Sequence, residues 1–280
     1  MGSEMCIRDR LNGPRGLALS PDSKYIYLAD YGNNRVSKFT VDGEYILSWG
    51  KRGEGKGEFK EPSGIAVDKD ENVYVADAWN SRIQKFDSNG KYLMEIGGVK
   101  ASFYSPRNVA VDRYGILYVA DTGTSRVHRF DTKGNRIGNP IGGIGKELGK
   151  FYEVFGIAFD SKDRVYVADC KNRRIVVLTS DLRPIRTIRV KAWEDVTPMW
   201  PMLAIDSRDY LYATSSGTQE IWIYDTKSPK FKYVGTLKVD TKGKPLFSDP
   251  LGITIDKYDN IYVSDTNVSK IIKLRPVFGR

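Results

Sequence analysis

The residues of this chain that are best suited to chemistry are few in type. Histidine occurs once, at His128, which argues against a histidine-rich metal site or a reaction that needs several histidines. The two cysteines, Cys6 and Cys170, are too few for a disulfide framework. Cys170 is followed by Lys171, which could lower the pKa of its thiol. Without a nearby histidine to act as base, Cys170 is still a weak candidate nucleophile.

A second set of chemically able residues recurs at a fixed spacing. An aspartate is followed five positions later by a basic residue, in the pairs Asp30/Arg35, Asp77/Arg82, Asp121/Arg126, Asp169/Arg174 and Asp265/Lys270. A ring of such carboxylates could in principle bind a metal. Because each carboxylate has its own cation in reach, we expect structural ion pairs instead. At the fifth site Ser215 and Glu220 replace both partners together, as expected for a pair with one shared role.

These pairs belong to a longer repeat that organises nearly the whole chain. In its clearest copy, Pro62 begins an apolar strand that ends at Asp68, Val73 begins a second that ends at Asp77, and a third follows from Arg82. The copies begin at positions 44 to 50 residues apart, near Pro14, Pro62, Pro106, Val154, Trp200 and Pro250. A tyrosine marks the second strand of every copy, at Tyr27, Tyr74, Tyr118, Tyr166, Tyr212 and Tyr262. Repetition at such a period indicates a repeat architecture.

The repeat predicts the fold class. Each unit holds three or four short strands with alternating polarity, separated by turns rich in glycine, aspartate and asparagine. No stretch carries a helical period over several turns, and none approaches the ~20 apolar residues that a membrane-spanning helix needs. Four-stranded units at this spacing are typical of propeller blades. We therefore expect an all-β protein, a six-bladed β-propeller of four-stranded antiparallel blades.

At these residues the sequence resembles the NHL-repeat family. The resemblance rests on Pro62–Asp68 (Pro-Ser-Gly-Ile-Ala-Val-Asp), Tyr74–Asp77 (Tyr-Val-Ala-Asp) and Asn80–Phe86 (Asn-Ser-Arg-Ile-Gln-Lys-Phe), and it covers roughly residues 11–274. It implies a six-bladed β-propeller. It implies much less about function, because one such scaffold hosts binding modules and enzymes alike.

Both ends depart from the repeat. Residues 1–10 fit no copy and look like a non-native leader, so we divide the chain into this leader and a single propeller domain over residues 11–280. The sixth copy shows no clear fourth strand after Leu274, so the last blade can be incomplete. We expect the natural protein to be longer and to have lost a signal peptide with its N-terminus. The compartment stays open, with a secreted or periplasmic one favoured.

Residues that occur once, on one rim of the ring, are the candidate site. The connections into the innermost strands and the loops between second and third strands should open on one side, which we call the mouth face. Asn108 stands where other copies have glycine, so its side chain should point toward the channel. Aromatic residues with arginines are typical of recognition surfaces. The candidate binding residues are Arg15, Tyr31, Trp79, Arg107, Asn108, Phe155, Trp193 and Trp200, although packing of the 190–202 connection is an equal explanation for Trp193 and Trp200.

The hypothesis that these residues favour is a non-catalytic binding scaffold. Its mouth face would hold a protein, peptide or glycan, with no catalytic residue, metal or cofactor.

Two alternatives stay open. Six-bladed relatives include lyases and lactonases, which implies a catalytic histidine, a histidine-bound metal, or calcium held by channel carboxylates and asparagines. His128 falls in a third strand, away from the channel, where packing is the simpler role. The other alternative is an RNA-binding NHL domain, compatible with the net charge of +9 and with aromatic residues that can stack on bases. Ordinary lysine-rich solubility is the favoured explanation of that charge.

Overall fold

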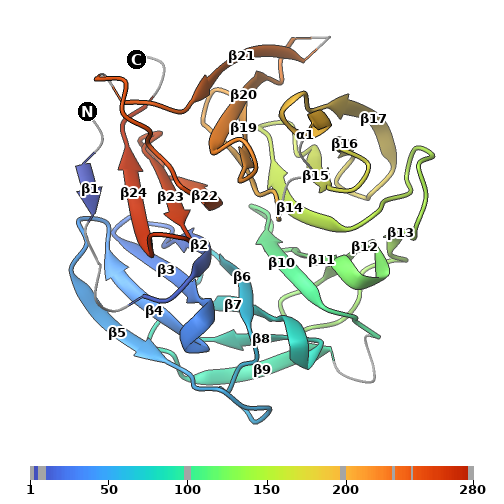
Figure 1. The fold of residues 1–280 in the computed structure, drawn as a ribbon. Coiled ribbons are helices and arrows are strands. Elements are labelled where there is room, and N and C mark those ends of the chain that lie inside the picture. The colour runs from blue at the N-terminus through green and yellow to red at the C-terminus, as the bar shows by residue number, and fades with distance from the viewer. Residues whose placement is uncertain are drawn as a thin grey trace.

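Six four-stranded antiparallel sheets surround a central channel (Figure 1). The structure is a computed structural model that describes residues 3–5, 11–97, 102–195, 200–228, 231–240 and 242–276. The predicted fold class, a six-bladed β-propeller, is confirmed. None of the helices in these ranges is both long and apolar enough to span a bilayer.

Each blade is built from strands that follow one another in sequence, with the innermost strand first. The first blade contains β2 (Pro14–Leu19), β3 (Tyr25–Asp30), β4 (Arg35–Thr40) and β5 (Tyr45–Trp49). The second contains β6 (Pro62–Val67), β7 (Val73–Asp77), β8 (Arg82–Phe86) and β9 (Tyr92–Gly97). The third contains β10 (Pro106–Val111), β11 (Leu117–Asp121), β12 (Arg126–Phe130) and β13 (Ile141–Gly142).

The fourth and fifth blades repeat the same order. The fourth contains β14 (Val154–Phe159), β15 (Val165–Asp169), β16 (Arg174–Leu178) and β17 (Pro184–Arg189). A single helical turn, α1 (Ala192–Asp195), follows it. The fifth contains β18 (Leu203–Ile205), β19 (Tyr210–Ser215), β20 (Glu220–Asp225) and β21 (Lys232–Leu237).

The sixth blade combines the two ends of the chain. Its three consecutive strands are β22 (Pro250–Ile255), β23 (Ile261–Asp265) and β24 (Lys270–Leu274). A short fourth strand, β1 (Ser3–Met5), pairs antiparallel with β24 and lies on its outer side (Figure 1). The fourth strand that the C-terminal copy lacks is thus supplied by the N-terminal segment. The division of the chain at residue 10 stays a prediction.

The strand register defines the mouth face. The first residue of an inner strand pairs with the aspartate that ends the second strand, as in Pro14 with Asp30 and Pro62 with Asp77. Chain segments that enter the inner strands therefore lie beside the loops between second and third strands. In three blades that loop begins with one turn of 3-10 helix: η1 (Tyr31–Asn33), η2 (Ala78–Asn80) and η4 (Thr122–Thr124).

The repeated tyrosine, and a phenylalanine that stands three residues before four of the copies, are core residues. In four blades the tyrosine hydroxyl donates a hydrogen bond to the aspartate that ends the first strand, for example Tyr166 to Asp160 at 3.0 Å. A buried hydroxyl of this kind needs such an acceptor. The aromatic residues Phe59, Phe103, Phe151 and Phe247 are all buried, and they help to fill the space between sheets.

The buried aspartate at the end of the second strand anchors the mouth loops. Asp77 accepts hydrogen bonds from the Lys60 amide at 2.8 Å, Asn80 Nδ2 at 2.9 Å, Arg82 Nε at 2.8 Å and Gln84 Nε2 at 3.0 Å. The equivalent carboxylates Asp30, Asp121, Asp169 and Asp265 also accept backbone amides of the segment that enters the inner strand.

The predicted aspartate–arginine pairing is confirmed in the first, second and fourth blades and is wrong in the third blade. Asp30 pairs with Arg35 at 2.8 Å and Asp169 with Arg174 at 2.7 Å, as Asp77 does with Arg82. Arg126 instead points to solvent, and Asp121 has Thr124 and His128 as its neighbours. His128 occupies the position that Gln84 has in the second blade, two residues after Arg126. In the third blade it is therefore His128, and not Arg126, that lies beside Asp121.

Close approach of neighbouring inner strands explains the glycine near the start of most copies. A Cβ atom at Gly64 would lie 2.5 Å from Asn108 Cα and 2.8 Å from Arg107 O, distances that packed atoms do not adopt. At Gly252 it would lie 2.2 Å from Arg15 O. Asn108 takes the corresponding place in the third blade, where its Nδ2 lies 3.4 Å from Phe155 O of the next blade.

We predict that Gly64→Ala destabilises the ring, by about 1–3 kcal/mol, because the new methyl group forces two inner strands apart. The matched control is Gly235→Ala in β21, where a Cβ atom meets nothing within 4 Å. Urea unfolding followed by far-ultraviolet circular dichroism measures both. Equal unfolding free energies for the two variants would contradict this account.

We predict that Asp77→Ala lowers the free energy of unfolding by about 3 kcal/mol, because it leaves the buried Arg82 and several buried donors without their acceptor. Asp70→Ala serves as the control, since Asp70 is exposed and pairs only with the neighbouring Lys69. Denaturant midpoints at neutral pH report the difference. A loss no larger than that of the control would refute the anchoring role.

Candidate functional site

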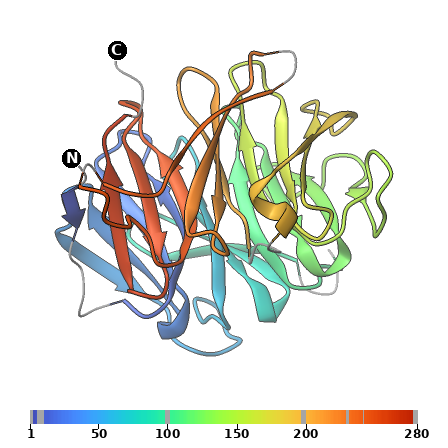
Figure 2. The ribbon, with the colours of Figure 1, turned by 45° about the horizontal axis from the view of Figure 1, so that its top comes forward.

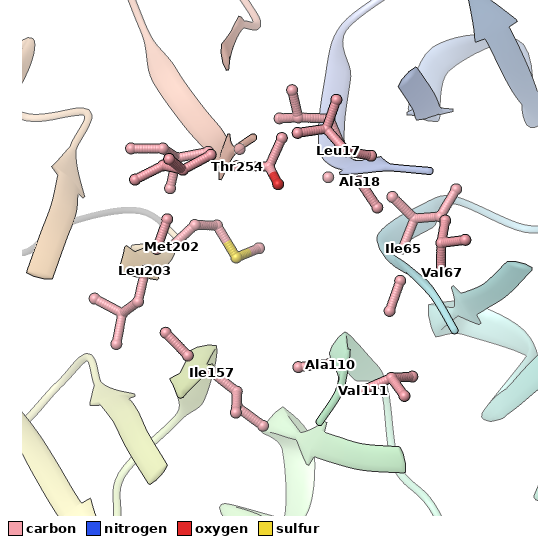
Figure 3. Close-up of a pocket in the computed structure, with 18 of the residues that line it drawn as sticks. Leu17, Ala18, Ile65, Val67, Ala110, Val111, Ile157, Met202, Leu203 and Thr254 are labelled. Atoms are coloured by element: carbon pink, nitrogen blue, oxygen red, sulfur yellow. The ribbon is translucent and has the colours of Figure 1, made fainter. Parts of the chain in front are cut away.

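The axial channel is chemically poor. It has a volume of about 440 Å³ and is lined by the inner strands of all six blades (Figure 3). Leu17, Ile65, Val111, Ile157 and Met202 are among the side chains around it. Its polar lining side chains are Ser20, Ser23, Asn108, Thr254 and Lys257, and none of its lining residues is a carboxylate. The channel wall therefore offers one amine, that of Lys257, but no carboxylate and no histidine for acid–base catalysis.

The mouth face carries two further cavities that share one wall. The first, of about 440 Å³, we call the aromatic cavity; its lining includes Trp79, Tyr104, Arg107, Tyr152, Phe155 and Trp200. The second, of about 470 Å³, we call the side cavity; its lining includes Tyr31, Asn34, Arg52, Lys60, Glu61 and Trp79. Trp79, which is 61% exposed, lines both. A substrate held in the aromatic cavity would thus lie next to the groups of the side cavity.

Three side chains from alternate blades meet at the mouth. The Arg15 guanidinium lies between two rings, with its carbon 3.1 Å from the Tyr31 centroid and 3.7 Å from the Trp200 centroid. The Arg107 guanidinium carbon lies 5.3 Å from the same Trp200 ring. Arg15 and Arg107 begin the first and third blades, and Trp200 precedes the fifth. Such cation–π contacts hold two like charges around one indole.

Arg15 is buried although it is charged. It is 6% exposed, and its Nε and Nη1 have no hydrogen-bond partner among the described residues. Arg107 Nη1 is likewise buried without a hydrogen-bond partner among the described residues. Burial lowers the pKa of Arg15 to about 10, and the nearby Arg107 contributes in the same direction. The guanidinium is still protonated at neutral pH, so the mouth contains a positive charge that its buried surroundings do not fully compensate.

Glu61 connects the arginines to the tryptophan wall. Trp79 Nε1 donates a hydrogen bond to Glu61 Oε2, and Tyr31 also hydrogen-bonds to Glu61. Tyr31 in turn stacks on Arg15. Burial raises the pKa of the Tyr31 phenol, and its hydrogen bond to Glu61 adds to this. Tyr31 therefore stays a proton donor at neutral pH, and the side cavity contains one carboxylate held by two neutral donors.

The structure brings most of the predicted site residues together. Arg15, Tyr31, Trp79, Arg107 and Trp200 meet at the mouth as described above. Phe155 lines the aromatic cavity but is only 2% exposed, so its ring forms part of the cavity wall more than of the open rim. Asn108 lines the channel and is mostly buried, as expected from its place in the repeat.

The expectation for Trp193 as a rim residue is wrong. Trp193 is fully buried in the packing between the fourth and fifth blades, and its Nε1 donates to Thr214 O at 3.3 Å. The sequence reason is local: α1 folds back over the blade, so an indole in this turn faces inward. The packing explanation is correct for Trp193, whereas Trp200 lies at the mouth. Part of the 190–202 connection, residues 196–199, lies outside the described residues.

Sequence reasoning missed Glu61. It immediately precedes Pro62, at the start of an inner strand, and the same place is occupied by Glu153 and Asp249 in two other copies. An acidic residue next to the repeat's first position was a usable signal. Only the folded chain shows that Glu61, and not the other two, is the acceptor for Trp79 and Tyr31.

The two remaining reactive side chains are packing residues. His128 is 4% exposed, lies edge-on to Phe103 with ring centroids 5.2 Å apart, and has Nε2 3.5 Å from Asp121 Oδ2. Cys170 is buried in the core, and burial raises the pKa of its thiol to about 12. Lys171 acts in the expected direction and lowers this pKa, but desolvation of the thiolate outweighs the lysine.

Comparisons with known proteins find one matching family model and several solved structures with the same fold. A family model described as the SMP-30/Gluconolactonase/LRE-like region matches residues 2–99. No curated protein sequence matches the chain significantly.

Several solved structures share the fold over nearly the full chain. A luciferin-regenerating enzyme is 13% identical, with a TM-score of 0.72, and the match covers 99% of this chain and 96% of that one. A gluconolactonase from Xanthomonas campestris is 15% identical, with a TM-score of 0.71 and coverages of 97% and 88%. A virginiamycin B lyase from Staphylococcus aureus, described as inactive after a histidine-to-alanine change, is 16% identical, with a TM-score of 0.65 and coverages of 99% and 99%.

The expectation of a non-catalytic binding scaffold is contradicted by these comparisons. The matched family model and the three structures all carry the names of enzymes. The comparisons favour the alternative, an enzyme of the lyase or hydrolase type. The sequence alone shows no catalytic cluster of histidines or metal ligands.

The metal sites implied by such relatives do not fit this chain. Calcium needs several oxygen ligands, with carboxylates prominent among them. The channel lining offers the Asn108 amide but no carboxylate. Within the described ranges, no group of three histidine, cysteine, aspartate or glutamate side chains could hold an ion. The one histidine is buried in a blade and cannot reach the mouth as a catalytic base.

We predict that millimolar calcium or a chelator leaves the melting temperature of the protein unchanged. A resident cation would stabilise the folded state by mass action, and its removal would lower the melting temperature. Differential scanning fluorimetry with EDTA and with added calcium chloride measures this, with magnesium chloride as the control for ionic strength. A calcium-specific increase would show that a binding site exists.

Proposed function

We propose that this protein is a metal-independent enzyme of the lyase or hydrolase type that opens an ester or lactone bond at its mouth face. The carrying observation is that the charge of one carboxylate, Glu61, acts on Arg15, whose guanidinium lies with that of Arg107 against the Trp200 ring. A base and a positively charged pocket are the two elements that such a reaction needs. The enzyme names of the matched family model and of the similar structures support the reaction class.

The arginines would stabilise the negative charge that forms on oxygen. In hydrolysis, attack of water on an ester carbonyl places that charge on the carbonyl oxygen. In elimination, a carbon in the alcohol part of the ester, next to a second carbonyl group, loses its proton and makes an enolate with charge on that second carbonyl's oxygen; the ester carboxylate then leaves from the neighbouring carbon. Arg15 and Arg107 present N–H groups that are fixed in place and free of competing acceptors in the described chain. Fixed donors of this kind stabilise a transition state without reorganisation.

Glu61 would act as the general base. In hydrolysis it takes a proton from water as the water oxygen bonds to the carbonyl carbon, and it returns the proton to the departing alcohol oxygen. In elimination it takes the carbon-bound proton, and the electron pair forms a double bond as the carbon–oxygen bond breaks. Tyr31 and Trp79 hold the carboxylate in place through their hydrogen bonds. Both are positioning residues in this proposal.

The repeat assignment at family level belongs to the same proposal. We infer that the blades are NHL-type repeats, supported by the recurring Tyr-Val-Ala-Asp strand end and by the aspartate–arginine ion pairs of three blades. The family model that matches the first third of the chain is a different propeller model, described above. An enzyme on a chain with NHL-like repeats is compatible with both observations, because the site lies in the mouth loops and not in the repeated positions.

The reaction is tested with purified protein, without added metal, on a panel of simple lactones and a streptogramin B depsipeptide. Mass spectrometry separates the two outcomes, since hydrolysis adds the mass of one water to the substrate and elimination adds none. Turnover of either kind supports the proposal. Absence of turnover across both substrate classes would count against it.

On a substrate that is turned over, we predict that Glu61→Gln lowers kcat by about 10²–10⁴-fold, because the amide cannot accept the proton. The matched control is Glu44→Gln, an exposed glutamate in the turn before β5. Unfolding curves show that both variants remain folded. Full activity of Glu61→Gln would remove this residue from the mechanism.

A further inference from the structure

The two mouth arginines lack the anion that buried guanidinium groups normally have. Arg15 Nε, Arg15 Nη1 and Arg107 Nη1 are all buried without a hydrogen-bond partner in the described ranges. Buried charged donors left in this state cost free energy, and structures generally satisfy them with a carboxylate, a phosphate or water. The blade arginines show the contrast, since Arg82 donates to Asp77, Glu95 and two backbone carbonyls.

The nearby carboxylates do not fill this role. Glu61 already accepts from Trp79 and Tyr31. Asp249 is the other acidic residue whose charge acts on Arg15, but it forms no ion pair with Arg15 among the described side chains. The pKa of Asp249 is raised by burial and by the adjacent Asp265. The pair of guanidinium groups therefore keeps an excess of positive charge at the mouth.

The adjoining space has a shape and lining suited to a flat apolar group. Arg107 and Trp200 form part of the aromatic cavity, together with Trp79, Tyr104 and Tyr152. Tyr104 is 66% exposed, so its ring is accessible from solvent. Aromatic walls favour planar substrates by stacking and by burial of apolar surface. A ligand with a planar body here would direct its end toward Arg107, which lines the cavity, and toward Arg15, which lies against the same Trp200 ring.

We propose that the mouth binds a small carboxylic acid with a planar apolar body, its carboxylate held by Arg15 and Arg107 and its body lying in the aromatic cavity. As a statement about substrate class it rests on the proposed function, since this acid would be the substrate or product of the ester-opening reaction. A carboxylate fits because it offers two oxygens in one plane, which matches the N–H edges of guanidinium groups. Opening of an ester also releases such a group.

The test uses benzoate as the probe, with benzamide as its neutral analogue of the same shape and inorganic phosphate as an anion without a planar body. Isothermal titration calorimetry at low, constant ionic strength measures the three affinities on the intact chain. We expect benzoate to bind more tightly than phosphate and benzamide to bind at least about tenfold more weakly than benzoate, because charged hydrogen bonds are lost. Raised salt should weaken benzoate binding, since the site is partly open to solvent.

Two variants locate the site. Arg107→Gln should weaken benzoate binding by about 10- to 100-fold, because one charged donor group is removed. Arg126→Gln is the control, since it removes the same charge from an exposed arginine of the same blade. Urea unfolding curves of Arg107→Gln and Arg126→Gln that match those of the parent chain would show that any loss of binding in Arg107→Gln does not come from a collapsed mouth.

The proposal is overturned if benzoate does not bind, if benzamide binds equally well, or if Arg107→Gln and Arg126→Gln behave alike. Phosphate binding tighter than benzoate would also overturn it, because the planar body would then contribute nothing. These results are separate from those on catalysis. Benzoate binding without turnover of any ester would support the acid site and refute the proposed reaction. Turnover without benzoate binding would support the reaction and refute the acid site.

Discussion

The hydrogen bonds of the buried aspartate that ends the second strand of five blades are the interaction on which the mouth depends. In the second blade Asp77 holds the Lys60 amide, one residue before Glu61, and in the third blade Asp121 holds the Tyr104 amide, three residues before Arg107. In the first blade Asp30 holds the Asn12 amide, three residues before Arg15. Residues that belong to the mouth are therefore fixed by residues that belong to the repeat. Catalytic geometry requires this kind of support from rigid elements.

The mouth is also where charge and packing oppose each other. Bringing Arg15 and Arg107 to one indole costs free energy through repulsion and burial, and the rings of Tyr31 and Trp200 return part of it through cation–π contacts. Functional sites commonly contain such locally unfavourable arrangements. The channel below shows the opposite character, with a mainly aliphatic wall (Figure 3). Figure 2 shows the ring of blades around it from a second direction.

Repetition explains how much of the molecule was predictable from sequence. Positions that recur in every copy, such as Tyr74 and Asp77, report the blade, and they gave the strand order and the ion pairs of three blades. Single residues have no such internal comparison. Trp193 and Trp200 look equivalent in the sequence, yet one is enclosed by α1 and the neighbouring blades and the other lies at the mouth. Glu61 was missed because its hydrogen bonds depend on Trp79 and Tyr31, which are distant in the sequence. The preference for an enzyme comes from the comparisons and not from the sequence.

The pairing of β1 with β24 ties the two ends of the polypeptide into one sheet (Figure 1). During synthesis on a ribosome, Ser3–Met5 emerges long before its partners Ile271–Lys273. Early blades can assemble on one another as they appear, but the ring cannot close until the sixth blade has emerged. Contacts of such large sequence separation fold slowly. The side of the first blade that packs against the sixth must therefore stay uncovered until then, and this is the interval in which a nascent propeller of this design is most open to chaperones and to misassembly with other chains.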